Sequence, residues 1–257
     1  MKRPTLHGIS RGLPLGGASS RSRQKTEQGV CVKERAPALP RPGRRYERRR
    51  ESVKVLIING SPRKGGNCER LLGEVTAVFD KEGVEYEILS LAGKSVRGCA
   101  ACGYCATHEG CVFRDEANLA AEKLREADGL VVASPVYYAS ANGSVISLLD
   151  RAFYSGRVDC RMKVGAAFAV ARRAGTSATF DELNKYFTIN QMPVASGRYW
   201  NDGFGREAGQ IEGDEEGLQN ARVVARNMVF LMKSIALGKE KFGLPETEET
   251  TFTHFIR

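Results

Sequence analysis

The sequence lacks any apolar stretch long enough to span a membrane. Apolar runs such as residues 55–58 and 130–133 fall far short of the about 20 residues that a membrane-spanning helix requires. No apolar segment follows the basic start, so we find no secretory signal. We therefore expect a protein with no membrane partner and a cytoplasmic location.

Acidic residues are scarce in only one part of the chain. Residues 1–52 contain 4 Asp and Glu against 14 Lys and Arg, which leaves 26 acidic and 25 basic residues for 53–257. The overall charge of +9 therefore belongs to the first segment, and we do not expect the rest to bind nucleic acid. Residues 1–52 bury too little apolar surface to order themselves, which predicts a basic, disordered leader. An organelle transit peptide and a polyanion-binding arm remain alternatives to a leader without specific function.

From residue 53 onward, strand-like apolar segments alternate with amphipathic helical segments. Residues 53–59 are typical of a strand buried on both faces, and residues 67–81 carry a helical apolar stripe. Further strands are expected at 84–91, 130–133, 164–170 and 192–195, and further helices at 115–127, 142–153, 177–187 and 215–235. This alternation predicts an α/β domain over 53–237, a doubly wound five-stranded parallel sheet with helices on both faces. We expect residues 238–257 to form a C-terminal tail.

The glycine-rich segment after the first strand is neither a G-x-G-x-x-G fingerprint nor a Walker loop. It nevertheless places glycines, polar side chains and cations at the start of a helix, where free N–H groups favour a phosphate. An ordinary strand–helix turn is the alternative. The candidate binding residues are Ser61, Arg63, Lys64, Gly66, Asn67 and Cys68. The position of Cys68 at the helix start further predicts a lowered thiol pKa.

Two more loops are expected beside the first, at the carboxyl ends of parallel strands. The loop after the third strand offers flat apolar surface for an aromatic ring system, with Pro135, Val136, Tyr137, Tyr138, Ala139 and Ser140 as candidates. The loop after the fourth strand contributes Arg172 and Gly175. Alternatively, the tyrosines pack in the core or an interface, and the arginines form a solvated turn.

Four of the seven cysteines lie within thirteen residues, in a loop at 98–112. Cys99, Cys102, Cys105 and Cys111 follow the spacing C-x2-C-x2-C-x5-C. Structural zinc sites have two C-x2-C pairs held apart by a long spacer, whereas this compact run resembles ferredoxin-type iron–sulfur ligation. We expect the loop at the ligand-binding edge of the sheet. The alternative is a set of reduced thiols without a metal.

These motifs together resemble the iron–sulfur flavoproteins, a branch of the flavodoxin-like NADPH-dependent FMN reductase superfamily. The resemblance rests on GSPRKGGNCE at 60–69, the four-cysteine spacing and ASPVY at 133–137, in this order within residues 53–235. It implies FMN with its phosphate on Ser61, Arg63 and Asn67 and its isoalloxazine by residues 135–140. It also implies that the four cysteines ligate a 4Fe–4S cluster, and that the chain forms homodimers or homotetramers.

The function that follows is an FMN-dependent oxidoreductase that passes electrons between a 4Fe–4S cluster and FMN. We find no His–carboxylate constellation and name no catalytic residue. The electron donor or acceptor is expected to be a small molecule, such as NAD(P)H, or a protein, such as a ferredoxin. An NAD(P)H-dependent FMN or quinone reductase without a cluster is the main alternative. A non-catalytic protein whose basic leader binds a polyanion is a third.

Overall fold

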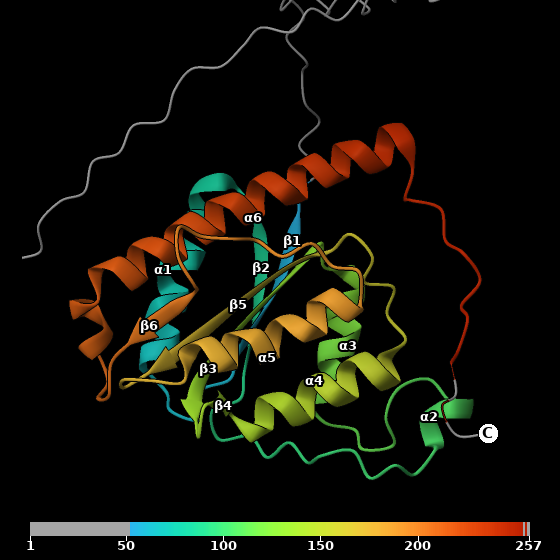
Figure 1. The fold of residues 1–257 in the computed structure, drawn as a ribbon, viewed down its shortest axis with the longest axis horizontal. Coiled ribbons are helices and arrows are strands. Elements are labelled where there is room, and N and C mark those ends of the chain that lie inside the picture. The colour runs from blue at the N-terminus through green and yellow to red at the C-terminus, as the bar shows by residue number, and fades with distance from the viewer. Residues whose placement is uncertain (1–51, 254, 256–257) are drawn as a thin grey trace, which may run out of the picture. The chain divides into compact units, whose positions relative to one another are not determined.

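A computed structural model describes residues 52–253 and residue 255 (Figure 1). Apart from Ser52, the predicted basic leader lies outside these residues. All structural statements below refer to the described part of the chain.

The core of the domain is a parallel β-sheet. Its strands are β1 (Lys54–Asn59), β2 (Glu85–Ser90), β3 (Gly129–Tyr137), β5 (Val164–Ala171) and β6 (Asp202–Phe204), in the spatial order β2-β1-β3-β5-β6. The two-residue β4 (Ser140–Ala141) pairs antiparallel with the end of β3. The strand order reverses between β1 and β3, where doubly wound folds bind their ligands. The sheet confirms the predicted fold class.

Helices cover both faces of the sheet. One apolar core lies under α1 (Asn67–Glu82) and α6 (Glu215–Phe242), and the other lies under α3 (Glu116–Glu126), α4 (Gly143–Gly156) and α5 (Thr176–Ile189). Side chains of β5 alternate between them: Phe168 joins the first core and Ala167 the second. The remaining elements are the short α2 (Tyr104–Thr107) and a 3₁₀ helix (Gln210–Gly213).

Two expectations about the elements were wrong: the position of the fifth strand and the end of the last helix. In the segment 192–195, only Val194 pairs with the sheet, through a single bridge to Gly165, and the fifth strand is β6. The sequence Asp-Gly-Phe of β6 has no strand-like pattern of its own, and it becomes a strand because its backbone pairs with Ala169–Ala171. The last helix continues beyond residue 235 to Phe242, into the segment predicted as a tail.

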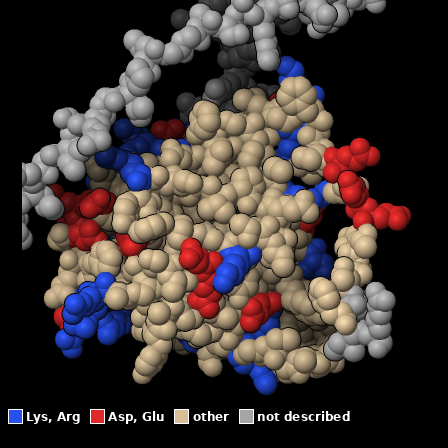
Figure 2. Space-filling model, in the orientation of Figure 1, with Lys and Arg blue, Asp and Glu red and all other residues tan. Residues whose placement is uncertain are grey.

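Charges of both signs are interspersed on the face shown in Figure 2, in keeping with the near-neutral composition of residues 53–257. Among the helices of the described residues, none is both long and apolar enough to cross a bilayer.

Candidate functional site

A cavity of about 160 Å³ lies at the carboxyl ends of β1, β3, β5 and β6, and we call it the strand-end cavity. The predicted residues that line it are Ser61, Arg63, Gly66, Asn67, Cys68, Pro135, Val136, Tyr137 and Arg172. The fold therefore brings parts of all three predicted loops to one place.

Other predicted residues do not line the strand-end cavity. Lys64 is exposed to solvent, and Tyr138, Ala139, Ser140 and Gly175 lie in the adjoining loops. The cavity instead includes four residues that sequence reasoning missed: Val170, Ala171, Gly205 and Arg206. The first two lie at the end of a predicted strand, a position that could have identified them. The last two follow β6, whose position was not foreseen.

The loop between β1 and α1 is held by hydrogen bonds from its backbone N–H groups to side chains, including Gly65 N–H to Glu69 Oε2 (2.9 Å). The Ser61 N–H donates to Asn59 Oδ1 (3.1 Å), and the Arg63 N–H donates to Ser61 Oγ (3.2 Å). The N-cap of α1 is Gly66, and no described side chain caps this end of the helix. A Cβ on Gly66 would lie 3.3 Å from Ser61 Oγ, so glycine keeps the loop tight. Uncapped N–H groups at a helix N-terminus attract an anion.

Arginines add positive charge beside these N–H groups. Arg63 and Arg172 line the strand-end cavity together with Arg206, and Arg63 Nη1 donates to the Arg206 carbonyl (3.2 Å). Arg206 also forms an ion pair with Glu207 (3.1 Å), which reduces the positive charge that Arg206 contributes to the cavity. The cations favour a phosphate or another anion at the start of α1.

Cys68 does not have the predicted lowered pKa. Its side chain is buried in the first turn of α1, and burial raises the pKa of the thiol to about 12. Desolvation of the thiolate therefore outweighs the favourable backbone contact at the helix start. The Cys68 side chain contributes shape to the strand-end cavity and does not provide a nucleophile.

The loop after β3 forms a tight hairpin with β4. Its two turn residues, Tyr138 and Ala139, have φ values of 53° and 58°, which place non-glycine residues in the left-handed region. Positive φ at both positions is typical of the two-residue turns that join twisted antiparallel strands. For a bulky residue such as Tyr138, this backbone conformation is strained. The side chain of Tyr138 is fully exposed at the tip. Strain of this kind often marks a functional loop.

Residues of the neighbouring helices hold this hairpin in place. The Glu182 carboxylate of α5 accepts hydrogen bonds from Ser140 Oγ (2.9 Å) and from the Ala141 N–H (2.8 Å). Gly175, at the N-terminus of α5, lies so close that a Cβ on it would be 2.8 Å from Ala139 Cα. The second and third predicted loops are therefore in contact.

Asn142, the N-cap of α4, connects the hairpin to the first loop. Its Nδ2 donates to the Gly60 carbonyl (3.1 Å) and its backbone N–H donates to Ser134 Oγ (2.9 Å). Its Oδ1 accepts from the Ser144 N–H (2.9 Å), which caps the helix. One asparagine thus fixes the relative positions of two cavity-lining loops.

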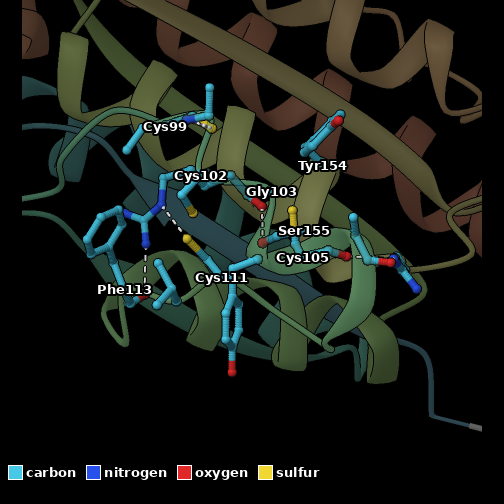
Figure 3. A pocket seen from close by; sticks show the side chains of 15 residues that line it. Cys99, Cys102, Gly103, Cys105, Cys111, Phe113, Tyr154 and Ser155 are labelled. Carbon is cyan, nitrogen blue, oxygen red and sulfur yellow. Dashed lines mark hydrogen bonds between the residues drawn. The ribbon is translucent and has the colours of Figure 1, made fainter.

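All four clustered cysteines line a second cavity of about 400 Å³, which we call the cysteine pocket (Figure 3). Its other side is formed by the C-terminal half of α4 with Arg151, Tyr154 and Ser155, and by Arg157 beyond it. The two cavities share no lining residue. In Figure 1, α2 of the cysteine loop lies well away from the hairpin of β3 and β4. The expectation that the cysteines lie at the ligand-binding edge was wrong, because the loop extends outward past α4.

The four thiols have the donor chemistry of an iron–sulfur site. Cys99 and Cys102 are exposed, Cys105 is half-buried and Cys111 is buried. Positive φ values at Ala101 and Gly103 turn the backbone around the pocket, and the Ala101 N–H donates to Cys99 Sγ (3.4 Å). Within the described residues, no three Cys, His, Asp or Glu side chains are grouped as around a metal ion. The donor set and the shared pocket fit a cluster bound by thiolates, for which the side chains must converge.

Side chains outside the predicted set hold the cysteine loop. The Asn118 side chain accepts from the Cys111 N–H (2.8 Å) and donates to the Cys111 carbonyl (2.9 Å). Arg157 Nη2 donates to the carbonyls of Cys105 (2.5 Å) and Ala106 (2.7 Å). Arg151 donates to Cys111 Sγ (3.2 Å), the bond drawn to the Cys111 sulfur in Figure 3. The sequence carried one signal for Arg151, a charge beside the apolar stripe of a predicted helix.

Comparisons with known proteins identify the family of this domain. A family profile described as NADPH-dependent FMN reductase matches residues 53–207. An iron–sulfur flavoprotein from Methanocaldococcus jannaschii is 32% identical over 192 residues, covering 71% of this chain and 99% of the relative. Another, from Methanosarcina thermophila, is 31% identical over 199 residues, covering 74% of this chain and 100% of the relative.

A solved structure supports the fold. RosB, crystallised with a bound riboflavin-phosphate derivative, has a TM-score of 0.56 at 17% identity, covering 80% of this chain and 94% of RosB. The family profile and the two relatives identify the family as well as the fold, because their matches extend over most of the domain. The chain is therefore a flavin-dependent oxidoreductase that belongs to the NADPH-dependent FMN reductase family, in its iron–sulfur flavoprotein branch.

Proposed function

We propose that this chain passes electrons between a 4Fe–4S cluster in the cysteine pocket and FMN at the strand-end cavity. The observation that carries the proposal is that Cys99, Cys102, Cys105 and Cys111 all line one pocket in a chain of the iron–sulfur flavoprotein branch. When bound, FMN exchanges electrons in pairs or singly, whereas a cluster carries one at a time. The role of the chain is to bind and orient both groups.

The strand-end cavity suits the phosphate end of FMN. Ser61, Asn67 and the uncapped N–H groups of α1 would bind the phosphate, and Arg63 would add charge. The volume of about 160 Å³ is below the roughly 300 Å³ at which pockets enclose a small ligand. The isoalloxazine would therefore lie against the more exposed residues 135–140.

The hairpin of β3 and β4 would orient the ring. Tyr137 lines the strand-end cavity and remains partly exposed, so it offers an aromatic face at the mouth. Glu182 and Gly175 hold the hairpin against α5. A fixed loop positions the flavin without reorganisation during the reaction.

A cluster in the cysteine pocket would receive or deliver single electrons. Cys99 and Cys102 are exposed, so a redox partner can approach a group that they bind. We propose a small molecule or a ferredoxin-like protein as this partner, and a homodimer or homotetramer as the assembly.

Iron analysis tests the proposal. Protein prepared and reconstituted without oxygen should contain about four irons per chain, and Cys102→Ser should lose the iron and keep FMN. The two cavities share no residue, which is why FMN should be retained. Cys31→Ser, outside the cysteine loop, is the matched control and should retain both. Unsubstituted protein that binds FMN but no iron would overturn the proposal.

The family profile favours a second candidate, an NAD(P)H-dependent FMN or quinone reductase without a cluster. Iron analysis of the unsubstituted protein separates the two, because a reductase without a cluster contains no iron before any substitution. Where iron is present, Cys102→Ser shows which reaction depends on it. If Cys102→Ser loses iron but oxidises NADPH as fast as the unsubstituted protein, hydride transfer needs only the strand-end cavity. If Cys102→Ser keeps FMN but no longer exchanges electrons with a one-electron donor, single electrons enter the protein through the cysteine pocket.

A further inference from the structure

Arg151 is a buried cation whose hydrogen bonds converge on the cysteine loop. Only 1% of its surface is exposed. It forms two bonds to the Asp115 carboxylate (2.6 and 2.8 Å), and it donates to the carbonyls of Arg97 (3.1 Å) and Phe113 (2.8 Å). The remaining donor, Nε, points at Cys111 Sγ at 3.2 Å. All five donors of the guanidinium are therefore used.

Structural needs account for four of these five bonds. Asp115 compensates the buried charge, and the two carbonyl contacts tie together the segments before and after the cysteines. The Nε bond is different, because a neutral thiol is a weak acceptor. A buried guanidinium interacts strongly only with a sulfur that carries negative charge.

We propose that Arg151 raises the reduction potential of the cluster that Cys111 would bind. It is a positioning residue that acts through Cys111, and the proposal rests on the proposed function. On reduction a one-electron donor loses one electron to the cluster, and no bond is made or broken. The added negative charge is stabilised by the guanidinium beside Cys111, as hydrogen bonds and charges near the sulfurs set such potentials.

The charges around Arg151 determine whether a substitution raises or lowers the reduction potential. Asp115 carries the opposing charge and weakens the influence of Arg151. Arg97 stacks over the Phe113 ring at 4.1 Å, but it is exposed and therefore screened by salt. Removing the buried cation should thus lower the potential, whereas removing its counter-charge should raise it.

Redox titration of the full-length protein with FMN and cluster bound tests this prediction. We expect Arg151→Gln to lower the reduction equilibrium constant about tenfold, which is about 59 mV for one electron. Asp115→Asn should shift the potential in the opposite direction. Asparagine is an equally good N-cap, so α3 keeps the hydrogen bond that the Asp115 side chain accepts from the Ala117 N–H. Arg161→Gln, a surface residue paired with Asp159, is the control and should leave the potential unchanged.

The outcomes separate this inference from the proposed function. Unchanged potentials in Arg151→Gln and Asp115→Asn, with iron still bound, would overturn the inference and leave the cluster in place. Unsubstituted protein without iron would overturn both. If Arg151→Gln does not fold, Asp115→Asn and Arg151→Lys decide the question. Lysine keeps the charge, so if Asp115→Asn raises the potential and Arg151→Lys leaves it close to that of the unsubstituted protein, the effect belongs to charge.

Discussion

The two cavities of this domain are built by different means. The strand-end cavity is formed by loops that leave four neighbouring strands, and the sheet register fixes where each loop starts. The cysteine pocket has no strand, and side chains such as Arg151, Arg157 and Asn118 hold its loop. The shape of the strand-end cavity therefore depends on the many backbone hydrogen bonds of the sheet. The shape of the cysteine pocket depends on a few polar side chains.

Helix α4 connects the two. Its N-cap, Asn142, contacts the loop after β1, and Arg151 contacts Cys111 nine residues later. Nine residues of α-helix span about 13 Å. If α4 is the main link, a substitution in one cavity should leave the other unchanged unless it alters this helix. Three variants examine the strand-end cavity, and the iron content of Arg63→Ala and Glu182→Gln tests that independence.

The largest effect is expected for Arg63→Ala. It removes a cation from the proposed phosphate site, which should weaken FMN binding by about 1.5–3 kcal/mol, or at least tenfold. Iron content should not change, because Arg63 is absent from the cysteine pocket. Fluorescence titration with FMN measures the affinity. Arg226→Ala, an exposed arginine of α6, is the charge-matched control. Unchanged FMN affinity in Arg63→Ala would place the phosphate elsewhere.

Gly175→Ala should have an intermediate effect. The added Cβ would approach Ala139 Cα within 2.8 Å, and φ is +90° at this position. The backbone strain alone should lower the free energy of unfolding by about 1–2 kcal/mol. Displacement of the hairpin should also weaken FMN binding.

Gly93→Ala is the control for Gly175→Ala, because Gly93 has φ +73° and no atom within 4 Å of an added Cβ. Chemical denaturation and FMN titration compare the two variants. Equal losses of FMN affinity in both would show that contact with the hairpin is irrelevant.

Glu182→Gln should have the smallest effect. Glutamine can still accept a hydrogen bond from Ser140 or Ala141, so only the difference between a charged and a neutral acceptor is lost. That difference is about 1 kcal/mol. FMN affinity should fall by less than about fivefold, with unchanged iron. A change of iron content in this variant would contradict the independence of the two cavities.

Much of the fold could be predicted because its signals are local. The apolar residues of β1 and the stripe of α1 follow the periods of a buried strand and an amphipathic helix. The loop between them was recognisable from its glycines and polar residues. The position of β6 was not predictable, because Asp202–Phe204 pairs with β5 without a strand pattern of its own. Gly205 and Arg206 were missed from the strand-end cavity for the same reason.

The sequence by itself determined the alternation of strands and helices, the glycine-rich loop and the spacing of the four cysteines. These features depend on residues close together in the chain. Only the tertiary structure decided that the cysteines lie beside α4, that Arg151 bonds to Cys111 across 40 positions, and that Gly175 meets Ala139. Such contacts depend on how helices pack on the sheet, and local periodicity carries no information about which distant residues will meet.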